Sequence, residues 1–190
     1  SSDLERATSA QELAIVGEVR PAAPHNVANA LAAAALARAF GVPASAVGEG
    51  LRTFVPAAHR IATVGSAHGV RYVDDSKATN AHAAQTSLAA YDPIVWIAGG
   101  MAKGQEFDEL VRTARPRLRG VVLLGVDQDV LGQALARHAP DVPVIAVRTT
   151  ETGAMAEVVQ HAASLAQSGD TVLLAPGCAS WDMFRDYTDR

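Results

Sequence analysis

The sequence predicts an α/β fold with a doubly wound, mostly parallel β-sheet, preceded by a helical tail from a separate domain. The first observation is that strands and helices alternate along residues 60–190. The second is that most of these strands are continuous apolar runs, as in parallel sheets covered by helices on both faces. The third is that residues 1–55 contain apolar helices but no complete sheet on which they could pack. The architecture expected for residues 60–190 is therefore Rossmann-like.

Length and composition are those of a globular chain. The 190 residues are 49% hydrophobic and 19% charged, and the formal net charge is −4. This charge provides no positive surface for nucleic acid or for an anionic membrane. The single cysteine, Cys178, excludes a disulfide within the chain. No apolar run reaches about 18 residues and no signal segment opens the chain, so we expect a soluble, cytoplasmic protein.

The first part of the chain reads as a weakly patterned start followed by two helices. Residues 13–16 are apolar enough for a strand. Residues 25–40 are rich in alanine and predict a helix, because glycine and proline follow directly. A second helix over residues 45–54 is expected to be capped by Ser45. We expect residues 1–55 to be the end of an incomplete domain and residues 56–59 to be a linker.

The rest of the chain begins with a hairpin and continues with alternating elements. Segments with strand character at 61–64 and 70–73 flank a turn at 66–69, which predicts a β-hairpin. Four further strands are expected at 94–98, 120–124, 144–147 and 171–175. Helices are expected at 80–90, 107–115, 128–138, 152–167 and from near Ser180 to Arg190.

Polar sequence follows three of the predicted strands, at 74–80, 99–104 and 176–184. Because parallel strands present their carboxyl ends at one edge of a sheet, we expect these loops to meet. Together they would place four side chains around one crevice: Lys77, Thr79, Lys103 and Ser180. Two ammonium groups and two hydroxyls suit a ligand with one or two carboxylates or phosphates.

Each of these loops also has a simpler explanation. Residues 74–80 can be read as a helix start capped by Asp75, Ser76 or Thr79, with Lys77 in solvent. Ser180 can likewise be an N-cap. Gly99–Gly100 can be a tight turn, and Lys103 a surface lysine. The coincidence of three similar loops at one predicted edge favours the binding site over these explanations.

Other features point away from several common sites. Cys178 fits a buried small residue better than a nucleophile, because no histidine is placed to activate it. Trp181 and Phe184 have the spacing of a buried helix face. The sequence contains neither G-x-G-x-x-G after the first strand nor G-x-x-x-x-G-K-[ST]. Its six histidines have no metal-ligand spacing, so no metal site is expected within the chain.

Taken together, these residues resemble the Mur ligases, the ATP-dependent amide-forming enzymes of peptidoglycan synthesis. Residues 25–30 (HNVANA) resemble the H-N-x-x-N segment of the family's central ATPase domain. Residues 59–60 (HR) resemble the pair at the junction to the last domain. Residues 74–80 (DDSKATN) are similar to the D-S-K-A-T-N signature of the members that add D-glutamate. Residues 176–184 (PGCASWDMF) are similar to the P-x-C-A-S-x-D-x-F stretch of the same members.

The resemblance implies a reaction in two steps. ATP, with Mg²⁺, phosphorylates the carboxylate of UDP-N-acetylmuramoyl-L-alanine, and the amine of D-glutamate then attacks the acyl phosphate. In this family the P-loop, the magnesium ligands, the modified lysine and the UDP-binding domain lie upstream of the segments matched here. The isolated chain is therefore expected to be inactive, and the full-length protein is expected to be a monomer.

The resemblance also implies roles for individual residues. Lys77 would lie near the transferring phosphoryl group, where a cation offsets developing charge. The implied nucleotide contacts are Asn26, Asn29, Arg60 and Asp75. The implied D-glutamate contacts are Thr79, Lys103, Ser180, Trp181 and Tyr187. The chain departs from the family pattern at Met101–Ala102, where a more polar pair is usual.

Two alternatives stay open. The first is another Mur-type ligase with a different amino-acid specificity, against which the D-S-K-A-T-N match argues. The second is a non-catalytic Rossmann-like module that binds a small anion. Tight binding of a dicarboxylate by the isolated chain without ATP would favour this second alternative.

Overall fold

A computed structural model describes residues 11–20, 24–149 and 153–190. The chain forms two compact units, Ser1–Pro56 and Ala57–Arg190. The boundary between them, after Pro56, lies within residues 56–59, the segment that the sequence predicts to be a linker. That the first unit is the end of an ATPase domain stays a prediction.

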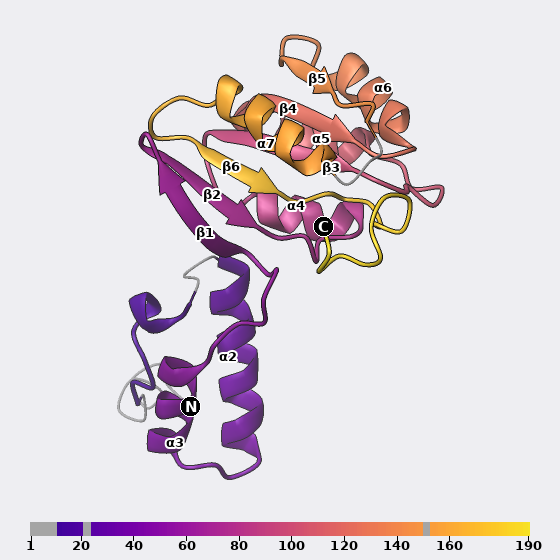
Figure 1. Ribbon diagram of the computed structural model, residues 1–190. Helices are drawn as coiled ribbons and strands as arrows, with labels where there is room; N and C mark the ends of the chain where they lie inside the picture. Colours follow the sequence, from indigo (N-terminus) through magenta and orange to yellow (C-terminus); the bar gives the residue numbers. More distant parts are fainter. Residues whose placement is uncertain (1–10, 21–23, 150–152) are drawn as a thin grey trace. The chain divides into compact units, whose positions relative to one another are not determined.

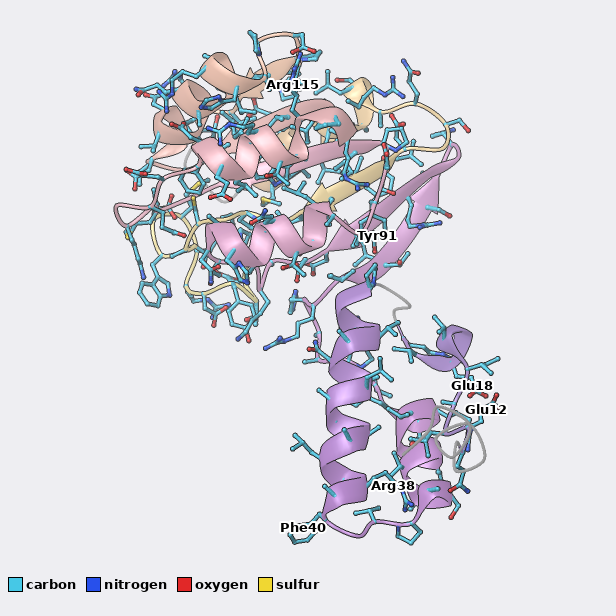
Figure 2. The ribbon with its side chains drawn as sticks, turned by 180° about the vertical axis from the view of Figure 1, so that it is seen from behind. Glu12, Glu18, Arg38, Phe40, Tyr91 and Arg115 are labelled. Atoms are coloured by element: carbon cyan, nitrogen blue, oxygen red, sulfur yellow. The ribbon has the colours of Figure 1, made fainter. Side chains whose placement is uncertain are left out.

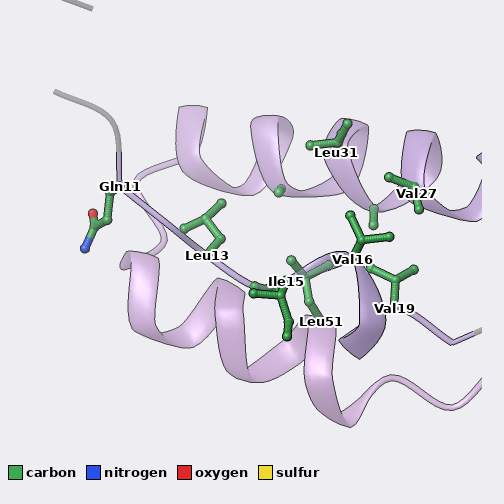
Figure 3. A pocket seen from close by; sticks show the side chains of 11 residues that line it. Gln11, Leu13, Ile15, Val16, Val19, Val27, Leu31 and Leu51 are labelled. Carbon is green, nitrogen blue, oxygen red and sulfur yellow. The ribbon is translucent and has the colours of Figure 1, made fainter. Parts of the chain in front are cut away.

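The described part of the first unit contains the 3₁₀ turn η1 (Val16–Glu18), α2 (Pro24–Ala39) and α3 (Ala44–Thr53). The segment before η1 runs against α3, where Arg52 Nη1 donates to the Leu13 carbonyl oxygen at 3.3 Å. Leu13, Val27 and Leu31 line an apolar hollow between this segment and the helices (Figure 3). The strand predicted at 13–16 is wrong, because this segment packs on helices and no other strand of the described first unit pairs with it.

The two helices of the first unit confirm the predicted ones, but the predicted serine cap is wrong. Ser45 lies inside α3, and Pro43 is the N-cap residue, with no side-chain capping bond. The φ of −57° that proline adopts here already suits the first turn of a helix. Apolar residues lie on all sides of α2, so some of them stay exposed. Leu36 is 73% exposed, and Phe40, just after the helix, is 91% exposed (Figure 2).

The second unit is built on a six-stranded sheet in the order β1-β2-β6-β3-β4-β5 (Figure 1). Its strands are β1 (Ala62–Ala67), β2 (Val70–Asp74), β3 (Ile94–Gly99), β4 (Leu118–Leu124), β5 (Val144–Ala146) and β6 (Thr171–Leu174). β1 and β2 are antiparallel and joined at His68–Gly69, which confirms the predicted hairpin. The other pairs are parallel, which confirms the predicted α/β class with a mostly parallel sheet.

Helices cover both faces of this sheet (Figure 1). They are α4 (Ala81–Leu88), α5 (Asp108–Ala114), α6 (Gln128–His138) and α7 (Ala154–Leu165), with the 3₁₀ turn η2 (Arg115–Arg117) after α5. On one face, Trp96 of β3 packs in a core with side chains of α4, α5 and α6. On the other face, Val95 and Ile97 pack in a core with Val158 of α7. All six residues of β3 are buried, so its sequence has to be apolar throughout.

The helix starts and the chain end differ from the prediction in detail. α4 begins after Asn80, whose Oδ1 accepts the Ala83 N–H at 2.9 Å, so the cap is neither an aspartate nor a hydroxyl. The helix predicted at 152–167 is present as α7, and Thr152 lies outside the described residues. The helix predicted after Ser180 is wrong, because residues 180–190 form successive turns. None of the helices within the described ranges is long and apolar enough to span a membrane.

Candidate functional site

The three polar loops meet at the carboxyl edge of the parallel strands. The Gly177 N–H donates to the Ala78 carbonyl oxygen at 2.9 Å, which joins the loop after β6 to the loop after β2. Met101 and Ala179 exchange two backbone hydrogen bonds of 2.9 and 3.1 Å, which join the loop after β3 to the same segment. The prediction that these loops share one edge is confirmed.

A fourth loop, which the sequence analysis did not single out, completes this edge. Residues 125–127 follow β4, and the Asp127 carboxylate accepts the Ala102 N–H at 2.8 Å. The Asp182 carboxylate, from the chain end, accepts the Val126 N–H at 2.9 Å. The available signal was of the same kind as for the other loops, polar sequence soon after an apolar strand, here Asp127 three residues after β4. These two aspartates connect the loop after β4 to the loop after β3 and to the segment after β6.

Asp74 and Asp75, at the end of β2, have different partners. Asp75 is buried, and its carboxylate accepts hydrogen bonds from the Ile61 N–H at 3.3 Å and from the Ser87 hydroxyl. Asp74 is half-buried, and its Oδ2 lies 2.6 Å from His59 Nδ1. Nucleotide contact by Asp75 stays a prediction, and in this arrangement both of its oxygens already accept hydrogen bonds from the protein.

Lys77 is half-buried and contacts an aromatic ring. Its Nζ lies 3.9 Å from the centroid of the Tyr187 ring. Its backbone N–H donates to the His59 carbonyl oxygen at 3.1 Å, and the His59 imidazole also meets the Tyr187 ring edge to face. Thr79 is half-buried on the same loop. The structure thus brings Lys77 and Tyr187, both predicted site residues, together in a cation–π contact.

Lys103 makes a second contact of the same kind, with its Nζ 3.8 Å from the centroid of the Trp181 ring. Trp181 is 65% exposed, so its interpretation as a buried helix residue is wrong, because no helix forms there. Ser180, beside it, is buried. Lys77 and Lys103 are the only lysines in the sequence. Each of them lies over a ring that residues 180–190 provide.

Cys178 lies beneath this edge, and its environment makes its thiol unreactive. Its side chain is 1% exposed, and burial raises the pKa of the thiol to about 12, although the charge of Arg190 opposes the shift. A thiol with such a pKa carries almost no thiolate at neutral pH. The interpretation of Cys178 as a buried residue and not a nucleophile agrees with this environment.

The other predicted nucleotide contacts lie on other segments. Arg60 is exposed, just before β1. On α2, Asn26 is half-buried and Asn29 is exposed. Their contact with a nucleotide stays a prediction. Within the described part of the chain, no group of three or more His, Cys, Asp or Glu side chains could hold a metal ion.

A mostly parallel sheet with cationic loops at its carboxyl edge defines a Rossmann-like domain suited to an anionic ligand. The family profile described as "Mur ligase, glutamate ligase domain" matches residues 59–178. The chain therefore belongs to the Mur ligase family.

Two curated relatives are similar over almost the whole chain. The UDP-N-acetylmuramoylalanine–D-glutamate ligase of Streptomyces avermitilis is 66% identical over 186 residues, which cover 98% of this chain and 40% of that protein. The protein of the same name from Thermobifida fusca is 64% identical over 183 residues, which cover 96% and 39%. The chain thus spans about 40% of the length of these relatives.

Solved structures support the fold. UDP-N-acetylmuramate-alanine ligase from Thermotoga maritima has a TM-score of 0.61 at 19% identity and covers 82% of this chain and 35% of its own. Mycobacterium tuberculosis folylpolyglutamate synthase, complexed with ADP, has a TM-score of 0.61 at 22% identity and covers 82% and 38%. At such low identity these likenesses concern the fold alone.

Proposed function

We propose that this chain is the C-terminal portion of an ATP-dependent ligase that joins D-glutamate to UDP-N-acetylmuramoyl-L-alanine through an acyl phosphate. The names of the similar relatives support this proposal. The observation that carries it is the meeting of three polar loops, with the only two lysines of the chain, at one edge of the sheet. In a bacterium the reaction would serve peptidoglycan synthesis in the cytoplasm, and through it cell shape and division. The full-length protein would be a monomer that binds neither nucleic acid nor membrane.

In the proposed reaction Lys77 stabilises the phosphoryl group while it is transferred. Lys77 is half-buried as a residue, and charges near a protein surface interact more strongly than charges in bulk water. A cation that is already in place offsets the developing negative charge without reorganisation. The contact with Tyr187 restricts the positions that the ammonium can take.

The amino-acid substrate would be bound by groups from three loops. D-glutamate has two carboxylates, and these would be bound by the Lys103 ammonium and by the hydroxyls of Thr79 and Ser180. The rings of Trp181 and Tyr187 would border the substrate. The proposed nucleotide contacts are Asn26, Asn29, Arg60 and Asp75.

Mg²⁺, when bound with ATP, would neutralise part of the phosphate charge. The described residues offer no carboxylate cluster that fits this ion, so no step of the proposal depends on them as its ligands. The sequence also has no G-x-x-x-x-G-K-[ST] loop to hold a triphosphate. We therefore propose that the isolated 190-residue chain forms no amide bond.

The experiment uses a full-length ligase that carries this sequence, supplied with ATP, D-glutamate and UDP-N-acetylmuramoyl-L-alanine. Lys77→Ala and Thr79→Ala should each lower kcat by about 10²- to 10³-fold, the usual effect of removing one stabilising group. Arg112→Ala, which removes an exposed cation of α5, is the matched control and should keep its activity. Near-normal turnover in both site variants would refute the assignment.

The same assay, together with a binding measurement on the isolated chain, separates the alternatives. Amide formation with another amino acid, and none with D-glutamate, would favour a ligase of different specificity. Tight binding of a dicarboxylate by the isolated chain, together with an absence of ligation by the full-length protein, would favour a small-anion-binding module.

A further inference from the structure

The guanidinium of Arg190 joins two of the loops at the strand ends. Its Nε donates to Ser76 Oγ at 2.9 Å, and its Nη2 donates to the Ser76 carbonyl oxygen at 2.8 Å. Its Nη1 donates to the Cys178 carbonyl oxygen at 3.4 Å. Ser76 directly precedes Lys77, and Cys178 lies two residues before Ser180. One side chain therefore contacts both the loop that carries Lys77 and the loop that carries Ser180.

The hydroxyl of Ser76 extends this connection to Tyr187. Ser76 is fully buried, and its Oγ donates to the Tyr187 carbonyl oxygen at 2.6 Å while it accepts from Arg190. A hydroxyl has one hydrogen to donate and two lone pairs, so both bonds can form at once. They hold the backbone of Tyr187 beside the loop whose lysine, Lys77, lies over the Tyr187 ring.

Arg190 occupies this position without an acidic partner. None of the ion pairs among the described residues includes it, and its acceptors are two carbonyls and one hydroxyl. Burial lowers the pKa of Arg190 to about 10, although the charges of Asp182 and Asp74 oppose the shift. Partial burial of a charge without an ion pair lowers the stability of the fold, so stability does not explain this position. The planar guanidinium can, however, bind three fixed acceptors at once, which a lysine cannot do.

We propose that Arg190 is a positioning residue for the ligase reaction, a role that rests on the function proposed above. It holds Ser76 and the Cys178 carbonyl in place, so that Lys77 and Tyr187 keep one arrangement. Arg190 touches no reacting atom in this role. Without it, Tyr187 would lose part of its connection to the Lys77 loop, and a shift of about 1 Å at a reacting centre can cost about 10²-fold in rate.

The first test measures kinetics of the full-length ligase. Arg190→Ala should lower kcat by about 10- to 100-fold and leave KM for ATP within about threefold, because the nucleotide contacts stay in place. Arg190→Lys should restore only part of kcat. Arg112→Ala removes an exposed cation of α5, away from residues 180–190, and should leave kcat unchanged. A folded Arg190→Ala enzyme, checked by its melting curve, with a kcat within about twofold of wild type would overturn the proposal.

The second test does not depend on turnover and uses the two lysines of the 190-residue chain. Reductive ¹³C-methylation labels the two lysines and the N-terminal amine, and the ring beneath each lysine ammonium shifts the NMR signal of that lysine. Lys77→Arg and Lys103→Arg each remove one lysine signal and so assign both. Arg190→Ala should move the Lys77 signal toward its value in an unfolded peptide and leave the Lys103 signal in place. Ser76→Ala, a milder change, should move the Lys77 signal in the same direction.

An unchanged Lys77 signal in folded Arg190→Ala or Ser76→Ala protein would overturn the proposal. This result differs from failure of the proposed function. A wild-type ligase that does not use D-glutamate would refute the function, whereas the Lys77 signal would still decide whether Arg190 positions this side chain.

Discussion

Replacing Gly125 by alanine tests how closely the loops at the strand ends approach one another. Gly125 has a φ of +89°, and a Cβ built there would lie 2.4 Å from Gly100 Cα and 2.7 Å from Asp182 Oδ2. Gly104 is a matched control in the same region, because its φ is +75° but no heavy atom lies within 4 Å of such a Cβ. Both substitutions place an L residue in left-handed backbone, and only Gly125→Ala adds a collision between loops.

The expected difference follows from these two contributions. An L residue in the left-handed region costs about 1–2 kcal/mol, so Gly104→Ala should lower the free energy of unfolding by about that amount. Overpacking of a tight contact costs about 1–3 kcal/mol more, so Gly125→Ala should lower it by about 2–5 kcal/mol in total. The contacts of Gly125 are backbone atoms of Gly100 and a carboxylate that already binds Val126, so the neighbours have little freedom to move.

The assay is urea unfolding of the 190-residue chain followed by tryptophan fluorescence. Both tryptophans, Trp96 and Trp181, belong to the unit Ala57–Arg190, so the signal reports that unit alone. The two variants should differ by about 1–3 kcal/mol at unchanged m-value. A difference below about 0.5 kcal/mol would show that the loops are not packed as closely as the geometry indicates.

Two further predictions concern the support of the sheet. Burial would raise the pKa of Asp170, but the Arg119 guanidinium and the Gln167 N–H hold that pKa below its usual value of 3.8. The ionised Asp170 carboxylate therefore stabilises the fold fully above pH 3.8, and this stabilisation is lost as the pH falls through the lower folded-state pKa. The urea midpoints of wild type and Asp170→Asn should differ at pH 7 and converge in acid. An equal difference between the two midpoints at both pH values would contradict this. Asn80→Ala should cost about 1 kcal/mol because the cap of α4 is lost, whereas Asn80→Asp should cost only a few tenths, and equal losses in the two would exclude a capping role.

Much of the second unit could be predicted because its elements depend on local patterns. The apolar run of β3 has all six residues buried, and such a run between two helices indicates a parallel strand. The order of strands and helices then places the loops after β2, β3 and β6 at one edge. The position of four side chains at this edge could be predicted for this reason: Lys77, Thr79, Lys103 and Ser180. Their roles in binding stay a prediction.

The details of the site could not be predicted because they depend on contacts between distant residues. Whether Asp74 or Asp75 is buried depends on Ser87 and Ile61, which pack against only one of them. The spacing of Trp181 is that of a helix, but the segment forms turns and leaves its ring 65% exposed. Local propensity cannot reveal either outcome, because tertiary contacts override it.

The sequence by itself determined the α/β class, the parallel strands and the family, because apolar periodicity and short motifs are properties of neighbouring residues. Only the tertiary structure decided that both lysines lie over aromatic rings and that Arg190 joins Ser76 to Cys178. Arg190 and Ser76 are separated by 114 residues, and their contact exists only once β6 has paired with β2 and the chain end has packed on the strand ends. The physical reason is that such contacts depend on the packing of complete elements, about which a local pattern carries no information.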